Sequence, residues 1–219
     1  MTLAPPASAA PQAPATGLET LVLPTGLKLS PEQFALVCEA NPEAVLELTA
    51  AGQLIAMPPT GGETGGRNNL LSTRLQVWAL GKGDWKVFDS STGFRLPDGS
   101  VLSPDASLVR LERWHALTSE QRRGFPPLCP DLVVELASPS DEGPRGVTAL
   151  RRKLTAYQTN GAQLGWLLFP QEQVVEVWPG RQSPEGPLPE PQRLEGVTEL
   201  DGGMVLPGLR LDLEEIWRG

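Results

Sequence analysis

The chain has 219 residues, of which 40% are hydrophobic and 20% are charged. These are values of a globular protein, and the length is enough to bury a substantial core. A net charge of −8 and a pI near 4.8 exclude a protein that binds nucleic acid through bulk positive charge. No stretch is long and apolar enough to span a membrane, so no membrane partner is expected.

The two ends of the chain differ in composition. Residues 1–17 are rich in Ala and Pro and predict a flexible tail, with neither the basic segment nor the apolar run of a secretion signal. Residues 18–219 predict a single domain with a proline-rich loop near 179–192. Cys38 and Cys129 have no metal-ligand spacing, and we expect reduced, packed thiols in a cytoplasmic protein.

Helices and strands are predicted in mixed order along the first half of the domain. Ser30 and Gln33 form a capping box, which begins a helix that ends near Ala40. Periodicity and turn residues then predict a hairpin (46–49 and 53–57), a helix (67–80), and two strands (85–96 and 101–109) joined at 97–99.

The second half continues this mixture. Thr148 is the expected N-cap of a helix over 149–159, and Gly161 suits its C-terminal cap. The other elements are a helix (112–123), strands (130–138, 164–169 and 174–178) and a short amphipathic helix (213–217). This order predicts an α/β (α+β) fold, with a central mixed β-sheet flanked by helices.

Glu135 lies in the middle of the apolar strand over 130–138. Strands with Leu and Val on both faces are buried on both faces, and an ionised carboxylate there must be paired or bind a metal. Asp105 lies in a second strand-like run, on the same face as Ser103 and Ser107. If the two strands are neighbours, both carboxylates meet on one face, where hard oxygen ligands suit Mg²⁺ or Mn²⁺.

The helix that follows selects one base from three adjacent ones. At about 100° per residue, Leu150, Leu154 and Tyr157 form the buried stripe, and Lys153 lies at its edge. Arg151 and Arg152 point away. A lysine beside two acids can hold a phosphate and stabilise developing negative charge. The alternative from spacing alone is a buried Glu135–Lys153 ion pair without chemistry.

Several stretches with weak individual motifs occur in a characteristic order, at 57–65, 88–94, 103–106, 130–136, 138–141, 153–167 and 206–209. With them the chain resembles the Uma-two family of restriction endonucleases, in the PD-(D/E)xK nuclease superfamily, over about residues 30–217. The resemblance implies a restriction-endonuclease-like fold. One departure is Phe169-Pro170, where the family commonly has Asp-Pro.

The resemblance also implies roles for individual residues. It assigns the superfamily's two acids to Asp105 and Glu135. The superfamily lysine would stand at Ala137, and this chain resembles the variant in which it has moved to the next helix, as Lys153. Glu63 resembles an extra acid that some of these nucleases bring to the metal, and the alternative is a solvated loop acid.

These observations lead to two hypotheses. The first is a Mg²⁺- or Mn²⁺-dependent endonuclease acting on DNA, with Asp105, Glu135 and the Leu136 carbonyl as metal ligands. Lys153 would stabilise the attacking hydroxide and the phosphate in the transition state. A homodimer is expected, because two symmetry-related sites cut two strands most simply. The second is a catalytically inactive binding or scaffold protein with the nuclease fold, which the acidic net charge favours.

Overall fold

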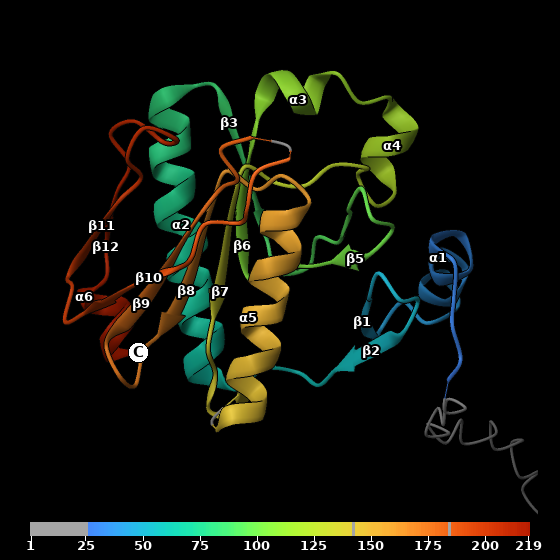
Figure 1. Ribbon diagram of the computed structural model, residues 1–219, viewed down its shortest axis with the longest axis horizontal. Helices are drawn as coiled ribbons and strands as arrows, with labels where there is room; N and C mark the ends of the chain where they lie inside the picture. The colour runs from blue at the N-terminus through green and yellow to red at the C-terminus, as the bar shows by residue number, and fades with distance from the viewer. Residues whose placement is uncertain (1–25, 142, 184) are drawn as a thin grey trace, which may run out of the picture.

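A six-stranded sheet forms the centre of the computed structural model, which describes residues 26–141, 143–183 and 185–219 (Figure 1). The expected tail at 1–17 lies outside these residues. In sheet order the strands are β10 (Gln192–Glu195), β9 (Val174–Pro179), β8 (Leu164–Phe169), β7 (Leu132–Leu136), β6 (Ala106–Arg110) and β3 (Trp85–Asp89). Strands β7 and β8 are parallel, and the other neighbours are antiparallel. The predicted mixed sheet is confirmed.

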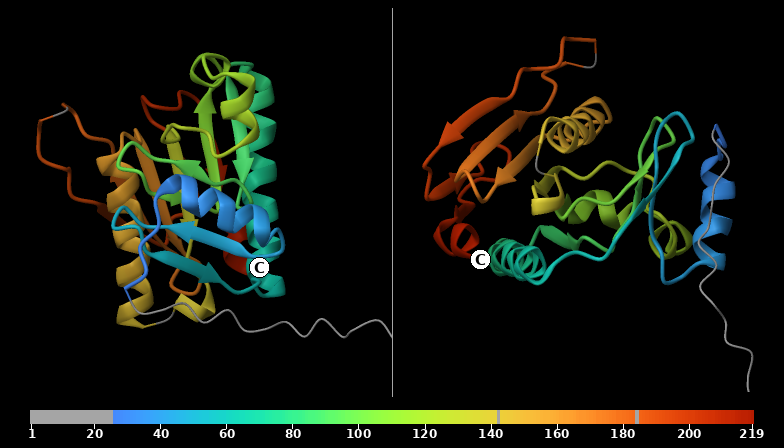
Figure 2. Two further views of the ribbon diagram at one scale, coloured as in Figure 1. Left: turned by 90° about the vertical axis from the view of Figure 1, so that its right-hand side faces the viewer. Right: turned by 90° about the horizontal axis from the view of Figure 1, so that it is seen from below.

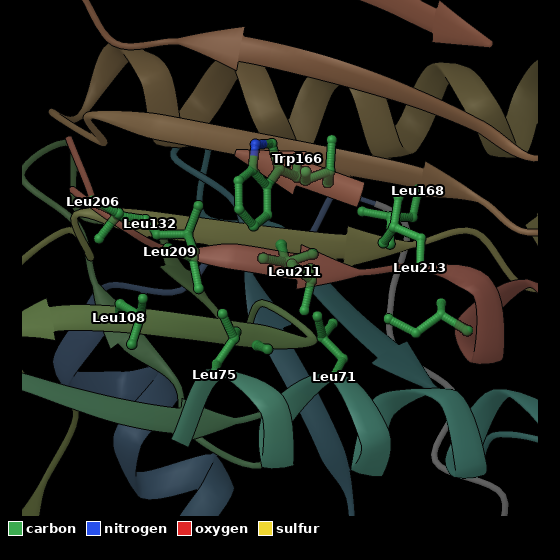
Figure 3. Close-up of a cluster of buried hydrophobic side chains, with 14 of the residues drawn as sticks. Leu71, Leu75, Leu108, Leu132, Trp166, Leu168, Leu206, Leu209, Leu211 and Leu213 are labelled. Carbon is green, nitrogen blue, oxygen red and sulfur yellow. The ribbon is translucent and has the colours of Figure 1, made fainter. Parts of the chain in front are cut away.

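Two long helices cover opposite faces of this sheet, α2 (Gly62–Lys82) and α5 (Pro144–Thr159) (Figure 2). On the α2 face, Leu71 and Leu75 pack against Trp166 of β8 and Leu211 of the C-terminal segment (Figure 3). That segment contains β11 (Glu199–Asp201), β12 (Arg210–Asp212) and α6 (Glu214–Arg218). The second core lies under α5, whose Leu154 and Tyr157 are buried.

Strand β7 is buried along its whole length, with alternate side chains in the two cores. Leu132, Val134 and Leu136 belong to the core under α2, and Val133 belongs to the core under α5. The predicted alternation is therefore confirmed. It places Glu135 on the face of the sheet that α5 covers.

A smaller sheet packs beside the main one, in the order β2-β1-β5-β4. Its strands are β1 (Val45–Leu48), β2 (Leu54–Met57), β4 (Phe94–Arg95) and β5 (Val101–Leu102). Helix α1 (Pro31–Ala40) starts at the predicted Ser30 capping box and packs Phe34 against Leu48 and Val101. The predicted hairpin over 46–57 is confirmed, and so is the hairpin turn predicted at 97–99, which joins β4 to β5.

The two long strands predicted over 85–96 and 101–109 were wrong, because each is divided between the two sheets. The first breaks after Asp89, whose carboxylate accepts hydrogen bonds from Ser91 and forms a turn. The second breaks at Ser103 and Pro104, between β5 and β6. Proline has no N–H to donate to a ladder, so the chain leaves the small sheet there.

Three helix boundaries also differ from those predicted. The helix over 112–123 is two short helices, α3 (Leu111–His115) and α4 (Ser119–Arg123), because Thr118 caps the second one. Helix α5 begins at Pro144, and the hydroxyl of Thr148 donates to the Pro144 carbonyl within the helix instead of capping it. Helix α2 begins five residues earlier than expected, at Gly62, since Gly61 is its N-cap.

The structure also bears on the predictions for the two cysteines and for membrane spans. Both cysteines are free, and burial raises the pKa of Cys129 to about 12. Among the described residues, no helix combines the length and apolarity needed to cross a membrane.

The core under α2 can be tested with two leucines of one helix. We expect Leu75→Ala to cost about 2–5 kcal/mol of unfolding free energy, because Leu75 is fully buried and its loss leaves a cavity. Leu80→Ala should change stability by less than about 0.5 kcal/mol, because Leu80 is 73% exposed. Urea unfolding measures both, and equal losses would contradict this packing.

Candidate active site

Lys153 lies at the centre of the candidate site and joins three elements. Its Nζ lies 2.8 Å from Oε1 of Glu47 on β1 and 3.0 Å from Oε1 of Glu135 on β7. It also donates a 2.8 Å hydrogen bond to the main-chain carbonyl of Ser103, between β5 and β6. The lysine side chain is 14% exposed, and the two glutamate side chains are 4% and 3% exposed. The ammonium is therefore buried among acceptors.

The helical phase that selected Lys153 from three bases is confirmed. Arg151 does not reach the cluster and forms an ion pair with Glu176 of β9, two strands away from Glu135 on the same face of the sheet. Arg152 is exposed. Lys153 shares the buried side of α5 with Leu154 and Tyr157, which pack against the sheet.

Asp105 lies directly before β6 and beside Glu135. Ala106 pairs with Val134 in the antiparallel β6–β7 ladder, so Asp105 and Glu135 are the next residues outward and share one face. Oδ2 of Asp105 accepts a 2.7 Å hydrogen bond from the Leu136 amide, and Oδ1 accepts one of 2.9 Å from Nδ2 of Asn68. Asn68 and Leu136 thus fix the carboxylate at the end of β7.

Glu47 belongs to this cluster, although the sequence did not single it out. It lies between two leucines in a hairpin strand, and one face of a hairpin is usually exposed to solvent. Here the face is covered, and Oε1 of Glu47 also accepts a 2.7 Å hydrogen bond from the Ser103 amide. The signal was the one that identified Glu135, an acid inside an apolar run, but the run is only four residues long.

Glu63 differs from the residues of this cluster because its side chain is exposed to solvent. Its side chain is 73% exposed in the first turn of α2, and it forms a 3.6 Å ion pair with Arg67 one turn later. Arg67 itself is buried and donates to the Ile216 carbonyl of α6. The structure therefore brings together Asp105, Glu135, Leu136 and Lys153 and leaves the Glu63 carboxylate in solvent.

The site holds more negative than positive charge. Burial raises the pKa of Glu135 to about 8, and the charges of Asp105 and Glu47 add to this effect while Lys153 opposes it. Burial also raises the pKa of Asp105. Burial alone would lower the pKa of Lys153, but the three carboxylates raise it above its usual value, so the ammonium stays protonated.

This donor set fits a divalent cation held largely by water. Among the described residues, no group of three or more His, Cys, Asp or Glu side chains has the geometry of a metal site. Mg²⁺ needs no such cage, because it keeps several waters and binds through one or two carboxylates. Asp105 and Glu135 supply two. Oε1 of Glu135 is paired with the Lys153 ammonium at 3.0 Å but accepts no hydrogen bond of good geometry from the described residues.

Comparisons with known proteins agree with this architecture. The Uma2 family, described as "Putative restriction endonuclease", matches residues 31–214. A crystal structure from Anabaena variabilis ATCC 29413, described as "a putative nuclease belonging to DUF820", has a TM-score of 0.67 at 18% identity, covering 87% of this chain and 98% of that one. No curated protein matches the chain. The resemblance and the nuclease-like fold expected from the sequence are confirmed.

The charge surplus predicts a pH dependence of stability for the metal-free protein. Since the pKa of Glu135 rises from 4.5 to about 8 on folding, the folded state keeps a proton that the unfolded state has lost between these values. Stability should therefore fall as the pH rises from about 4.5 to about 8 and then level off. Glu135→Gln should make this dependence shallower, as thermal melts in EDTA would measure.

Glu63→Gln is the matched control for this measurement, because it removes one exposed carboxylate. It should leave the dependence of the melting temperature on pH as in the wild type. A wild-type protein equally stable at pH 5 and pH 8 would contradict the buried, under-compensated Glu135 carboxylate.

Proposed function

We propose that this chain, which belongs to the Uma2 family, is a divalent-metal-dependent endonuclease that hydrolyses DNA phosphodiester bonds. The family and the fold support a nuclease. The observation that carries the proposal is the convergence of Asp105, Glu135 and Lys153 from three elements on one buried face of the sheet. Each is an ionisable group at a position where apolar side chains are usual, and ionisable groups with perturbed pKa values gather at functional sites.

We infer that Asp105, Glu135 and the Leu136 carbonyl would hold Mg²⁺ or Mn²⁺. Hard cations prefer these oxygen ligands, and their charge would offset the surplus of carboxylates. When bound, the cation would supply activation of a water molecule and neutralisation of phosphate charge. The Leu136 amide donates a hydrogen bond to Asp105 and so holds this carboxylate next to Glu135, the preceding residue of β7.

Lys153 would stabilise the negative charge that develops on the phosphate. An ammonium group has three N–H donors, and those of Lys153 face Glu47, Glu135 and the Ser103 carbonyl. If the Glu135 carboxylate bound a cation in place of Lys153, one N–H of the ammonium would become available to the phosphate. Glu47 and Ser103 would still hold the lysine, so Glu47 acts as a positioning residue.

The same saturation of Lys153 favours a second candidate, a binding or scaffold protein with the nuclease fold and no catalysis. If Glu135 never leaves the lysine, the cluster is a structural ion-pair network that joins the two sheets. The two candidates differ in metal binding, because a structural network has no need for a cation.

Metal binding and cleavage can be measured on the same variants. We expect Asp105→Asn and Glu135→Gln to abolish Mn²⁺ binding in calorimetry and to lower plasmid nicking by about a hundredfold or more. EDTA should stop the wild-type reaction. Glu63→Gln should keep both properties, because its carboxylate is exposed and pairs with Arg67.

The outcome of these measurements decides between the candidates. A wild-type protein that binds no Mn²⁺ near neutral pH would sink the nuclease proposal and favour the scaffold. If folded Glu135→Gln protein nicked plasmid at the wild-type rate, the assignment of Glu135 would be wrong. A loss in Glu63→Gln equal to that in Asp105→Asn would add Glu63 to the metal ligands.

The positioning role of Glu47 has its own test. Glu47→Gln keeps an acceptor for Lys153 and should lower kcat by about tenfold, whereas Glu47→Ala should lower it by about a hundredfold. The KM for DNA and the affinity for Mn²⁺ should change little, since Glu47 is not among the proposed metal ligands. Equal kcat values for both variants and the wild type would contradict this role.

A further inference from the structure

We propose that the groove between strand β3 and helix α4 binds the phosphate backbone of DNA beside the bond that is cut. The proposal rests on the proposed nuclease function and adds a second contact to it. The groove encloses about 480 Å³ and is lined by residues that include Lys86, Phe88, Trp114, Arg122, Gly124 and Pro126. These residues come from β3, the loop after it, α3, α4 and the chain that follows α4.

The groove lies on the same face of the sheet as the carboxylates. Phe88 pairs with Ser107 of β6, and Ser107 pairs with Val133 of β7, so these three side chains form one row. Asp105 lies two residues before Ser107, which is about 7 Å along the strand. A duplex that presents a phosphate to Asp105 and Glu135 is long enough to reach the groove as well, because one helical turn is about 34 Å long.

Two cations line the groove without an acidic partner among the described residues. Nζ of Lys86 lies 5.5 Å from the ring centre of Phe88 and 5.3 Å from that of Trp114. These rings, themselves 5.0 Å apart, hold the ammonium at the groove by cation–π contact. Arg122 is exposed at the end of α4 and forms no ion pair with the carboxylates of the described residues.

This arrangement differs from that of most arginines in the chain. Nine of the fourteen arginines form an ion pair with at least one carboxylate of the described residues: Arg67, Arg74, Arg95, Arg110, Arg113, Arg151, Arg193, Arg210 and Arg218. Arg123 follows Arg122 and is likewise exposed. In a protein of net charge −8, unpaired cations beside an acidic site favour a polyanion as the occupant.

One acid, Asp89, also lines the groove, but its carboxylate is hydrogen-bonded to a neighbouring residue of the same loop. Oδ1 of Asp89 accepts hydrogen bonds from the amide of Ser91 at 3.1 Å and from its hydroxyl at 2.6 Å. These bonds turn the carboxylate into the loop after β3. Lys86 and Arg122 therefore remain available to phosphate oxygens.

The test compares two double variants with the same change in net charge. Lys86→Met with Arg122→Gln removes the groove cations but keeps the Lys86 stem against the rings. Lys28→Ala with Lys82→Ala removes two exposed lysines elsewhere on the chain. Binding of a fluorescein-labelled duplex of about three helical turns, in Ca²⁺, is followed by anisotropy at several salt concentrations.

We expect the groove variant to bind about tenfold more weakly and to lose about two units of the slope of log K against log salt. The Lys28/Lys82 variant should match the wild type. At saturating DNA, the nicking rate of the groove variant should stay within about threefold of the wild type, because it keeps Asp105, Glu135 and Lys153.

Each other outcome has a distinct meaning. Equal slopes for the two double variants, or a wild type that binds no DNA, would overturn the groove proposal. A wild type that binds through the groove but cuts no DNA would overturn the nuclease function and leave the groove contact standing. Melting temperatures of both variants check that neither is unfolded.

Discussion

The ammonium of Lys153 is the interaction on which the arrangement of the site depends. It contacts Glu135 of the main sheet, Glu47 of the small sheet and the Ser103 carbonyl between the two sheets, and all three contacts are in the interior. Without that charge, Glu47, Glu135 and Asp105 would repel one another across an apolar core. The small sheet is therefore attached to the main one at the site, and hydrophobic contacts of Phe34, Leu48 and Val101 hold its outer side.

The sequence predicted those parts of the site that follow from regular periodicity. Strand alternation placed Glu135 on the α5 face, and helical phase separated Lys153 from Arg151 and Arg152, because both depend only on local geometry. The mixed sheet followed from the order of elements. Glu47 did not follow, since its burial depends on which distant segment covers a short hairpin strand. The exposure of Glu63 was equally hidden, because it depends on where α2 begins.

The breaks in the predicted strands have the same origin. Ser103 and Pro104 interrupt a run that would otherwise continue in one sheet, and the amide and carbonyl of Ser103 bond to Glu47 and Lys153 instead of to a neighbouring strand. Residue propensities alone predict only a local irregularity at Ser103 and Pro104. In the folded protein they lie where the two sheets meet beside the buried carboxylates, and charged side chains satisfy the backbone groups of Ser103.

The parallel pairing of β7 with β8 has a consequence for how such a site can evolve. The connection between two neighbouring parallel strands must cross one face of the sheet, usually as a helix, and its preferred handedness determines which face that helix covers. Here α5 covers the face that bears both Glu135 and Ala137. A lysine on this helix and a lysine at position 137 could therefore both place their ammonium group near Glu135. A lysine could therefore pass from strand to helix through intermediates carrying both, without loss of the charge at any step.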